Sequence, residues 1–180
     1  IERNTVFFKR PPRLPDEDHL AAIQDAGELV LTDGGMQQYE VSAYSLEGFQ
    51  CRHNGNYWRF GDYLGIGAGA HGKVTGADGT VRRYANKRQP GEYMADPAPA
   101  SWHSLEGAEL RAEYLLNALR LRDGFTTAHF CRRTGLDAAT LQPELDRLQE
   151  RGLLHREKDR VATTDLGWRF LDSVIAEFLP

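Results

Sequence analysis

The chain has 180 residues, of which 41% are hydrophobic and 27% are charged, and this balance suits one or two ordinary domains with a hydrophobic core. Its net charge of −4 comes from 22 basic and 26 acidic residues, and neither half is strongly basic, so the charge gives no support for a nucleic-acid partner. We expect neither a transmembrane segment nor a signal peptide, because no apolar run is long enough to span a bilayer.

The use of cysteine predicts a cytoplasmic protein. Cys51 and Cys131 are too few for a disulfide framework, and reduced thiols are the default inside the cell. The chain begins at Ile1 within a sequence pattern rather than at Met, so we expect a piece of a longer protein.

The first predicted elements are a β-prone run at 5–8, an extended proline-rich arm at 10–15 and a helix that starts near Pro15 and stops at Gly34. One face of this helix carries residues at helical spacing that predict a buried stripe: Leu20, Ile23, Gly27 and Val30. An unpaired strand edge at 5–8 favours pairing with a second copy, so we expect a homodimer through that edge.

The middle of the chain predicts strands. Residues 38–44 alternate as a strand, and residues 73–84 form a hairpin around the turn at 76–79, where an Asp-Gly pair is typical of a tight turn. Between them lies an irregular run at 51–72 with no amphipathic period. Residues 96–103, rich in proline and small side chains, are predicted to be a linker.

The C-terminal part predicts helices at 105–121, 126–134 and 137–151, a small hairpin at 153–161 and a last helix at 164–179. This order is typical of a winged helix. Such a module suggests DNA binding as one function, but its third helix carries more acidic than basic side chains, which phosphates would repel: Asp137, Glu144, Asp146 and Glu150 against Arg147 and Arg151.

The run at 51–72 is the best candidate for a binding site. It combines two histidines, four aromatic residues and many glycines, which allow a ligand or another chain to approach the backbone closely. His53 is the strongest ligand candidate, because a neutral imidazole binds haem iron and the rings of Tyr57 and Trp58 could stack on a porphyrin. The alternative is a structural role, in which the histidine hydrogen-bonds the backbone of a bend.

Two other motifs in this run are weak. Residues 67–72 spell GxGxxG, but a strand and a hairpin follow instead of the helix that a nucleotide-binding fold needs. The Cys51-x-His53 pair has no second pair at the spacing of a zinc finger, so structural zinc is not expected.

The same run resembles the HNxxYW region of HemW, a family of radical-SAM haem chaperones related to oxygen-independent coproporphyrinogen III oxidase (HemN). The resemblance rests on the segments 53–58, 60–67 and 70–72. It is extended by 39–44 upstream, by Asn86, Lys87 and Tyr93 downstream, and by 113–179, which is similar to the HemN C-terminal domain.

The resemblance implies a mixed α/β fold. Residues 1–95 would be the end of a radical-SAM (β/α) partial barrel with extra strands, with residues 1–5 as its last strand. Residues 96–103 would be the linker, and residues 104–180 a small winged-helix-like α+β domain.

The resemblance also implies a haem site. His53 would bind the iron, with Asn54, Tyr57 and Trp58 beside the porphyrin and His71 as a weaker candidate. The third motif position is Gly55, where a bulkier residue is expected, and glycine loosens the backbone there.

The implied function is that of a haem chaperone that passes haem to an unidentified haem-dependent client protein. Its [4Fe–4S] cluster and S-adenosylmethionine (SAM) would bind upstream of this chain, because radical-SAM chemistry needs three closely spaced cysteine thiolates and Cys51 and Cys131 are isolated. We therefore expect this chain not to cleave SAM. The alternative is an oxidase of porphyrin biosynthesis, for which an intact HNxxYW motif is not expected.

Overall fold

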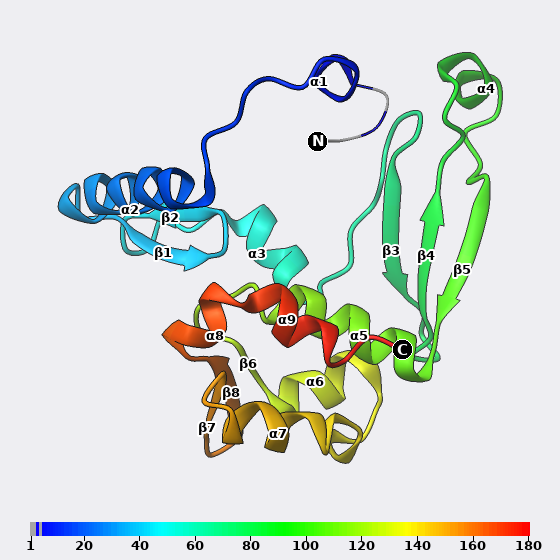
Figure 1. Cartoon of the computed structure of the whole chain (residues 1–180). Coiled ribbons are helices and arrows are strands. Elements are labelled where there is room, and N and C mark those ends of the chain that lie inside the picture. Colours follow the sequence, from blue (N-terminus) through cyan, green and yellow to red (C-terminus); the bar gives the residue numbers. More distant parts are fainter. Residues whose placement is uncertain (1–2, 4) are drawn as a thin grey trace.

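The computed structural model describes residue 3 and residues 5–180. It has mixed α/β architecture, with helices around three small antiparallel sheets (Figure 1). Residues 1, 2 and 4 of the last barrel strand predicted at 1–5 lie outside the described residues. The N-terminal elements are α1 (Val6–Lys9), α2 (Glu17–Asp33), β1 (Gln37–Glu40) and β2 (Ala43–Ser45).

The strand predicted at 5–8 is wrong. The Thr5 hydroxyl accepts a hydrogen bond from the backbone N–H of Phe8 at 3.1 Å and caps the single helical turn of α1. β-branched and aromatic residues form a strand only where another strand supplies hydrogen bonds, and no strand pairs with this segment in the described part of the chain. The strand edge on which the predicted homodimer depended is therefore absent.

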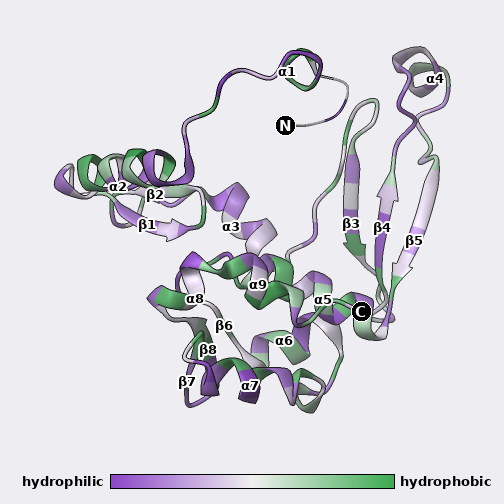
Figure 2. Cartoon of the chain, viewed as in Figure 1, coloured by the Kyte–Doolittle hydropathy of each residue, from purple (hydrophilic) through white to green (hydrophobic). Residues whose placement is uncertain are grey.

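Helix α2 forms where the sequence predicts it. The Asp16 carboxylate accepts a hydrogen bond from the N–H of His19 at 2.9 Å, and the helix ends at Gly34. The predicted buried stripe is wrong, because α2 has no buried residue and Ile23 and Val30 are 62% and 72% exposed. Figure 2 shows hydrophobic segments along α2, which lies beside the β1–β2 hairpin and apart from the C-terminal helices.

The single strand predicted at 38–44 is a hairpin instead, because Val41 and Ser42 turn the chain between β1 and β2. Three further strands form a longer sheet in the order β3-β4-β5: β3 (His71–Thr75), β4 (Val81–Ala85) and β5 (Ser101–Leu105). The predicted hairpin around 76–79 is confirmed, with Thr75 opposite Val81 and Gly79 at φ +82°.

The sheet runs out from the molecule and carries α4 (Pro90–Ala95) at its far end (Figure 1). The predicted linker at 96–103 is partly wrong, because its last three residues belong to β5. Ser101 pairs with Ala85 and His103 with Arg83. The division of the chain at this place into two domains stays a prediction.

The C-terminal part follows the predicted order of elements, with two helices interrupted. Its elements are α5 (Gly107–Ala118), β6 (Phe125–Thr126), α6 (Thr127–Thr134), the 3₁₀ helix η1 (Ala138–Leu141), α7 (Glu144–Glu150), β7 (Leu154–Glu157), β8 (Arg160–Thr163), α8 (Asp165–Arg169) and α9 (Leu171–Ala176). Pro143 separates η1 from α7, since proline offers no N–H to continue a helix. Phe170 separates α8 from α9. The strands pair in the order β6-β8-β7.

One hydrophobic core connects the run at 51–72 to the C-terminal elements. The fully buried Tyr114 of α5 lies at its centre, with ring contacts to Phe60 at 5.4 Å, Phe125 at 5.4 Å and Phe130 at 5.1 Å. Phe60 follows the predicted binding motif directly, so burial of its ring fixes the motif against α5.

Candidate functional site

The predicted motif lies on a helix, so the expectation that 51–72 is wholly irregular is wrong. Helix α3 spans Arg52–Trp58, and Phe60 ends it in a left-handed conformation with φ +55°. The Asn56 side-chain amide donates to the carbonyl of Asp62 at 2.9 Å, and the N–H of Gly61 donates to the carbonyl of Asn56 at 2.8 Å. A helix of two turns held by such end contacts needs no amphipathic period, which is why the pattern gave no sign of it.

His53 lies on the exposed side of α3. Its ring meets the ring of Tyr57, one turn later, edge to face at a centroid distance of 4.8 Å, and Tyr57 in turn lies 4.3 Å from the ring of Tyr63. The His53 ring takes part in no hydrogen bond within the described residues. Its nitrogens are therefore available to an external ligand, which fits the chemistry of an axial haem ligand.

Trp58 faces another side of the helix. Trp58 lies five positions after His53, which corresponds to a rotation of about 140° around the helix axis. The guanidinium of Arg120 lies 4.4 Å from the centre of the Trp58 ring system, and the indole Nε1 is buried without a hydrogen-bond partner. A flat ligand beside His53 would therefore meet Tyr57 rather than Trp58.

The remaining predicted site residues are dispersed. Asn54 is half-buried on α3, and His71 is exposed at the start of β3, opposite Ala85. Gly55 is buried, and a Cβ there would lie 2.7 Å from Nη1 of Arg59, so a bulkier residue would displace that arginine. No hydrogen bond, ion pair or ring contact in the described part of the chain joins the His71 side chain to α3, and the ligand roles of Asn54 and His71 stay predictions.

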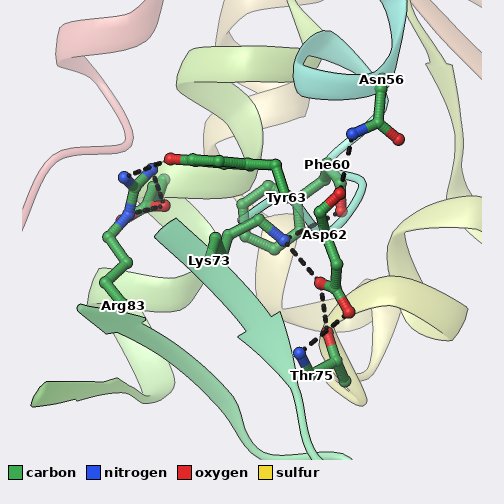
Figure 3. Close-up of polar contacts among 8 residues, drawn as sticks. Asn56, Phe60, Asp62, Tyr63, Lys73, Thr75 and Arg83 are labelled. Carbon is green, nitrogen blue, oxygen red and sulfur yellow. Dashed lines mark hydrogen bonds and ion pairs between the residues drawn. The ribbon is translucent and has the colours of Figure 1, made fainter. Parts of the chain in front are cut away.

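A buried lysine holds the segment that follows α3 (Figure 3). Lys73 is only 2% exposed, and its ammonium donates to the Phe60 carbonyl at 3.1 Å and to the Asp62 carboxylate at 3.3 Å. Asp62 also accepts from the N–H and the hydroxyl of Thr75, at 2.9 and 2.8 Å. Sequence reasoning missed Lys73, because no pattern identifies which lysine of a strand points inward.

The environment of this pair shifts both pKa values downward. Burial lowers the pKa of Lys73 below its ordinary 10.5, and the nearby carboxylate of Asp62 opposes this only in part. Burial alone would raise the pKa of Asp62, but the hydrogen bonds from Thr75 and the charge of Lys73 hold it below its ordinary 3.8. The pair is therefore structural in character: it fixes the turn between Phe60 and β3.

A second ionic contact joins the sheet to the C-terminal helices (Figure 3). The guanidinium of Arg83 on β4 donates through Nε to the Glu113 carboxylate of α5 at 2.6 Å and through Nη1 to the Tyr63 hydroxyl at 3.0 Å. Nε and Nη2 of Arg83 both reach the same carboxylate oxygen, Oε1 of Glu113, and such a charge-assisted contact is stronger than one between neutral groups. It orients β4 against α5 and places Tyr63 beside Tyr57.

Other classes of site have no support in the described part of the chain. No group of three or more histidine, cysteine or acidic side chains is arranged there to hold a metal ion. Among the same residues, no helix has both the length and the hydrophobicity needed to cross a membrane. His53, within the predicted motif, is therefore the first candidate ligand, and His71 stays the weaker one.

The comparison with protein families matches residues 105–170 to the HemN C-terminal domain. Along 99% of its length the chain is 43% identical to the haem chaperone HemW of Escherichia coli (strain K12) and 38% identical to that of Haemophilus influenzae. It is 31% identical to the mitochondrial radical S-adenosyl methionine domain-containing protein 1 of Bos taurus. The chain spans 44–47% of the length of these relatives.

One solved structure has a similar fold. The structure of the radical-SAM coproporphyrinogen III oxidase HemN from Escherichia coli matches 92% of this chain with a TM-score of 0.66, and the match covers 42% of that protein. At 14% identity this likeness concerns the fold alone. The chain therefore corresponds in sequence to the C-terminal portion of the HemW haem chaperones, and its residues 105–170 match the HemN C-terminal domain.

Proposed function

We propose that this chain is the C-terminal portion of a haem chaperone and that His53 binds the haem iron. The observation that carries the proposal is the exposed His53 imidazole, which has no hydrogen bond in the described part of the chain and is supported by the ring of Tyr57. A structural histidine would be engaged by the backbone instead. Relatives named as haem chaperones at 43% and 38% identity support the same function.

In the intact protein, the [4Fe–4S] cluster and SAM would bind outside this chain, which has only two cysteines, Cys51 and Cys131. The intact protein would then deliver haem to a haem-dependent client. The oxidase is the weaker candidate, because its likeness to this chain rests on the fold at 14% identity. The delivery of haem to a client protein and the cytoplasmic location of the protein both belong to this proposal.

A haemin titration tests the iron ligand. We expect the 180-residue chain to give a saturable shift of the haem Soret band, and His53→Ala to weaken the binding by about tenfold or more, since an axial bond is lost. His155→Ala is the matched control, because His155 is likewise exposed but lies on β7. Coincident curves for the parent and His53→Ala would exclude His53 as the ligand.

A further inference from the structure

A cavity of about 360 Å³ lies between α3, α5, α6 and the segment 121–126, at the lower end of the range for small-molecule pockets. Its lining comes from separate parts of the chain: Tyr39, Gln50, Trp58, Arg59, Tyr114, Ala118, Leu121, Asp123, Gly124, Phe125, Thr126, His129 and Arg160. His53 is not among these residues. The cavity is therefore distinct from the proposed iron ligand.

The inner wall of the cavity consists mainly of buried apolar groups. Four buried side chains form it: Tyr114, Ala118, Leu121 and Phe125. Two of them, Tyr114 and Phe125, are aromatic. The indole of Trp58 adds a further flat surface, held in place by Arg120. Flat apolar walls of this kind favour a planar ring system over a flexible chain, because the ring loses little conformational freedom on binding.

The remaining lining is rich in cationic groups. Arg59 and Arg160 are exposed, and neither makes an ion pair with a carboxylate in the described residues; Arg160 donates to the Asp123 carbonyl at 2.8 Å. Asp123 contributes the single carboxylate of the lining. Two guanidiniums without acidic partners beside an apolar wall are a favourable place for an anionic group.

His129 adds a donor or acceptor at the same place. Its Nδ1 is hydrogen-bonded to the Tyr114 hydroxyl at 2.7 Å, which fixes the ring. Burial lowers the pKa of His129, and the charges of Arg132, Arg133 and Arg59 lower it further, so positive potential gathers at this end of the cavity.

We propose that the cavity binds a small aromatic anion: a ring system of one or two fused rings that stacks against the apolar wall, with a carboxylate facing Arg59 and Arg160. The site is additional to the haem site, and the proposal does not depend on haem binding.

Two probes of the same shape, one anionic and one neutral, test whether binding in the cavity depends on the negative charge. Isothermal titration calorimetry with naphthalene-2-carboxylate and its neutral analogue naphthalene-2-carboxamide isolates the contribution of the carboxylate. We expect the parent chain to bind the carboxylate about tenfold or more tightly than the amide, since one charge-assisted hydrogen bond is worth at least that factor. Arg59→Met with Arg160→Met should reduce this ratio to about one.

Two further variants distinguish loss of the positive charge in the cavity from a general effect of the substitutions on folding. Arg59→Lys should retain part of the preference, because it keeps the positive charge. Arg13→Met should leave the ratio unchanged, because Arg13 lies in the exposed arm between α1 and α2. Equal binding of both probes by the parent, no binding of either, or an unchanged ratio in the double variant would each overturn the proposal.

Discussion

Lys73 is a charged residue enclosed almost completely by protein. Its ammonium is satisfied by two oxygen acceptors and lies 4.0 Å from the centre of the Phe60 ring. An enclosed charge is tolerated when its donors are paired, and it becomes costly when a partner is removed. The stability of the segment after α3 therefore depends on Asp62 through Lys73.

Asp62→Asn should lower the free energy of unfolding by about 1–3 kcal/mol, because a neutral amide no longer compensates the enclosed positive charge of Lys73. The measurement is urea denaturation followed by circular dichroism. Adding Lys73→Met to this variant should restore part of the loss, since the charge itself is then gone. Asp25→Asn on the exposed helix α2 is the control and should change little. An additive double variant would contradict the coupling.

Close contact between two backbone segments determines how helix α8 packs against the residues that lead into strand β7. Gly167 of α8 lies so close to the start of the β7 region that a Cβ there would be 1.8 Å from the carbonyl oxygen of Leu153. Since this oxygen belongs to the backbone, no side-chain rotation relieves the clash. Glycine is therefore required where α8 lies against the backbone that leads into β7.

Gly167→Ala should lower the thermal unfolding midpoint, because overpacking of this kind costs about 1–3 kcal/mol or more. Gly27→Ala is the matched control: Gly27 is also helical, but nothing lies within 4 Å of its Cβ position. That variant should stabilise α2 by about 0.5–1 kcal/mol, since alanine is the better helix former. Equal midpoints for the two variants would refute the crossing contact.

The whole molecule is open in shape. Helices α1 and α2 stand apart from the C-terminal core, and the sheet of β3, β4 and β5 extends on another side (Figure 1). The N-terminal helices expose large apolar side chains, among them Phe7, Ile23 and Val30. Such surfaces are typical of places where another protein surface binds.

We therefore expect the 180-residue chain to self-associate through α2 rather than through a strand edge. Ile23→Lys should lower the sedimentation coefficient observed at high protein concentration, because it places a charge in the apolar surface. Gln24→Lys, which introduces lysine at the neighbouring position, should leave the sedimentation coefficient unchanged. A monomeric parent at all concentrations would contradict this expectation.

Local signals of the sequence were sufficient for much of the fold. The start of α2 near Pro15, its stop at Gly34 and the turn at 76–79 are consequences of local residues, and the structure has each of them. Burial was not predictable in the same way. The periodicity of α2 indicates an apolar face, yet the packing partner that would bury it is not part of the local sequence.

The candidate site was predictable only in part. The motif pointed to His53, and the structure leaves that ring exposed and unbonded in the described part of the chain. The separation of His53 and Trp58 around α3 depends on residues 53–58 being helical, and those residues lack the periodicity that indicates a helix. The contributions of His129 and Arg160 to the cavity depend on tertiary packing, which brings them to α3 from far along the chain.

Short connections and side-chain contacts anchor the base of the β3–β5 sheet. Only Glu106 separates β5 from α5, Leu105 belongs to the hydrophobic core, and Arg83 pairs with Glu113. Helix α4 lies at the opposite end of the sheet from this base (Figure 1). Any tilt of the sheet about its base would therefore displace α4 further than the base itself.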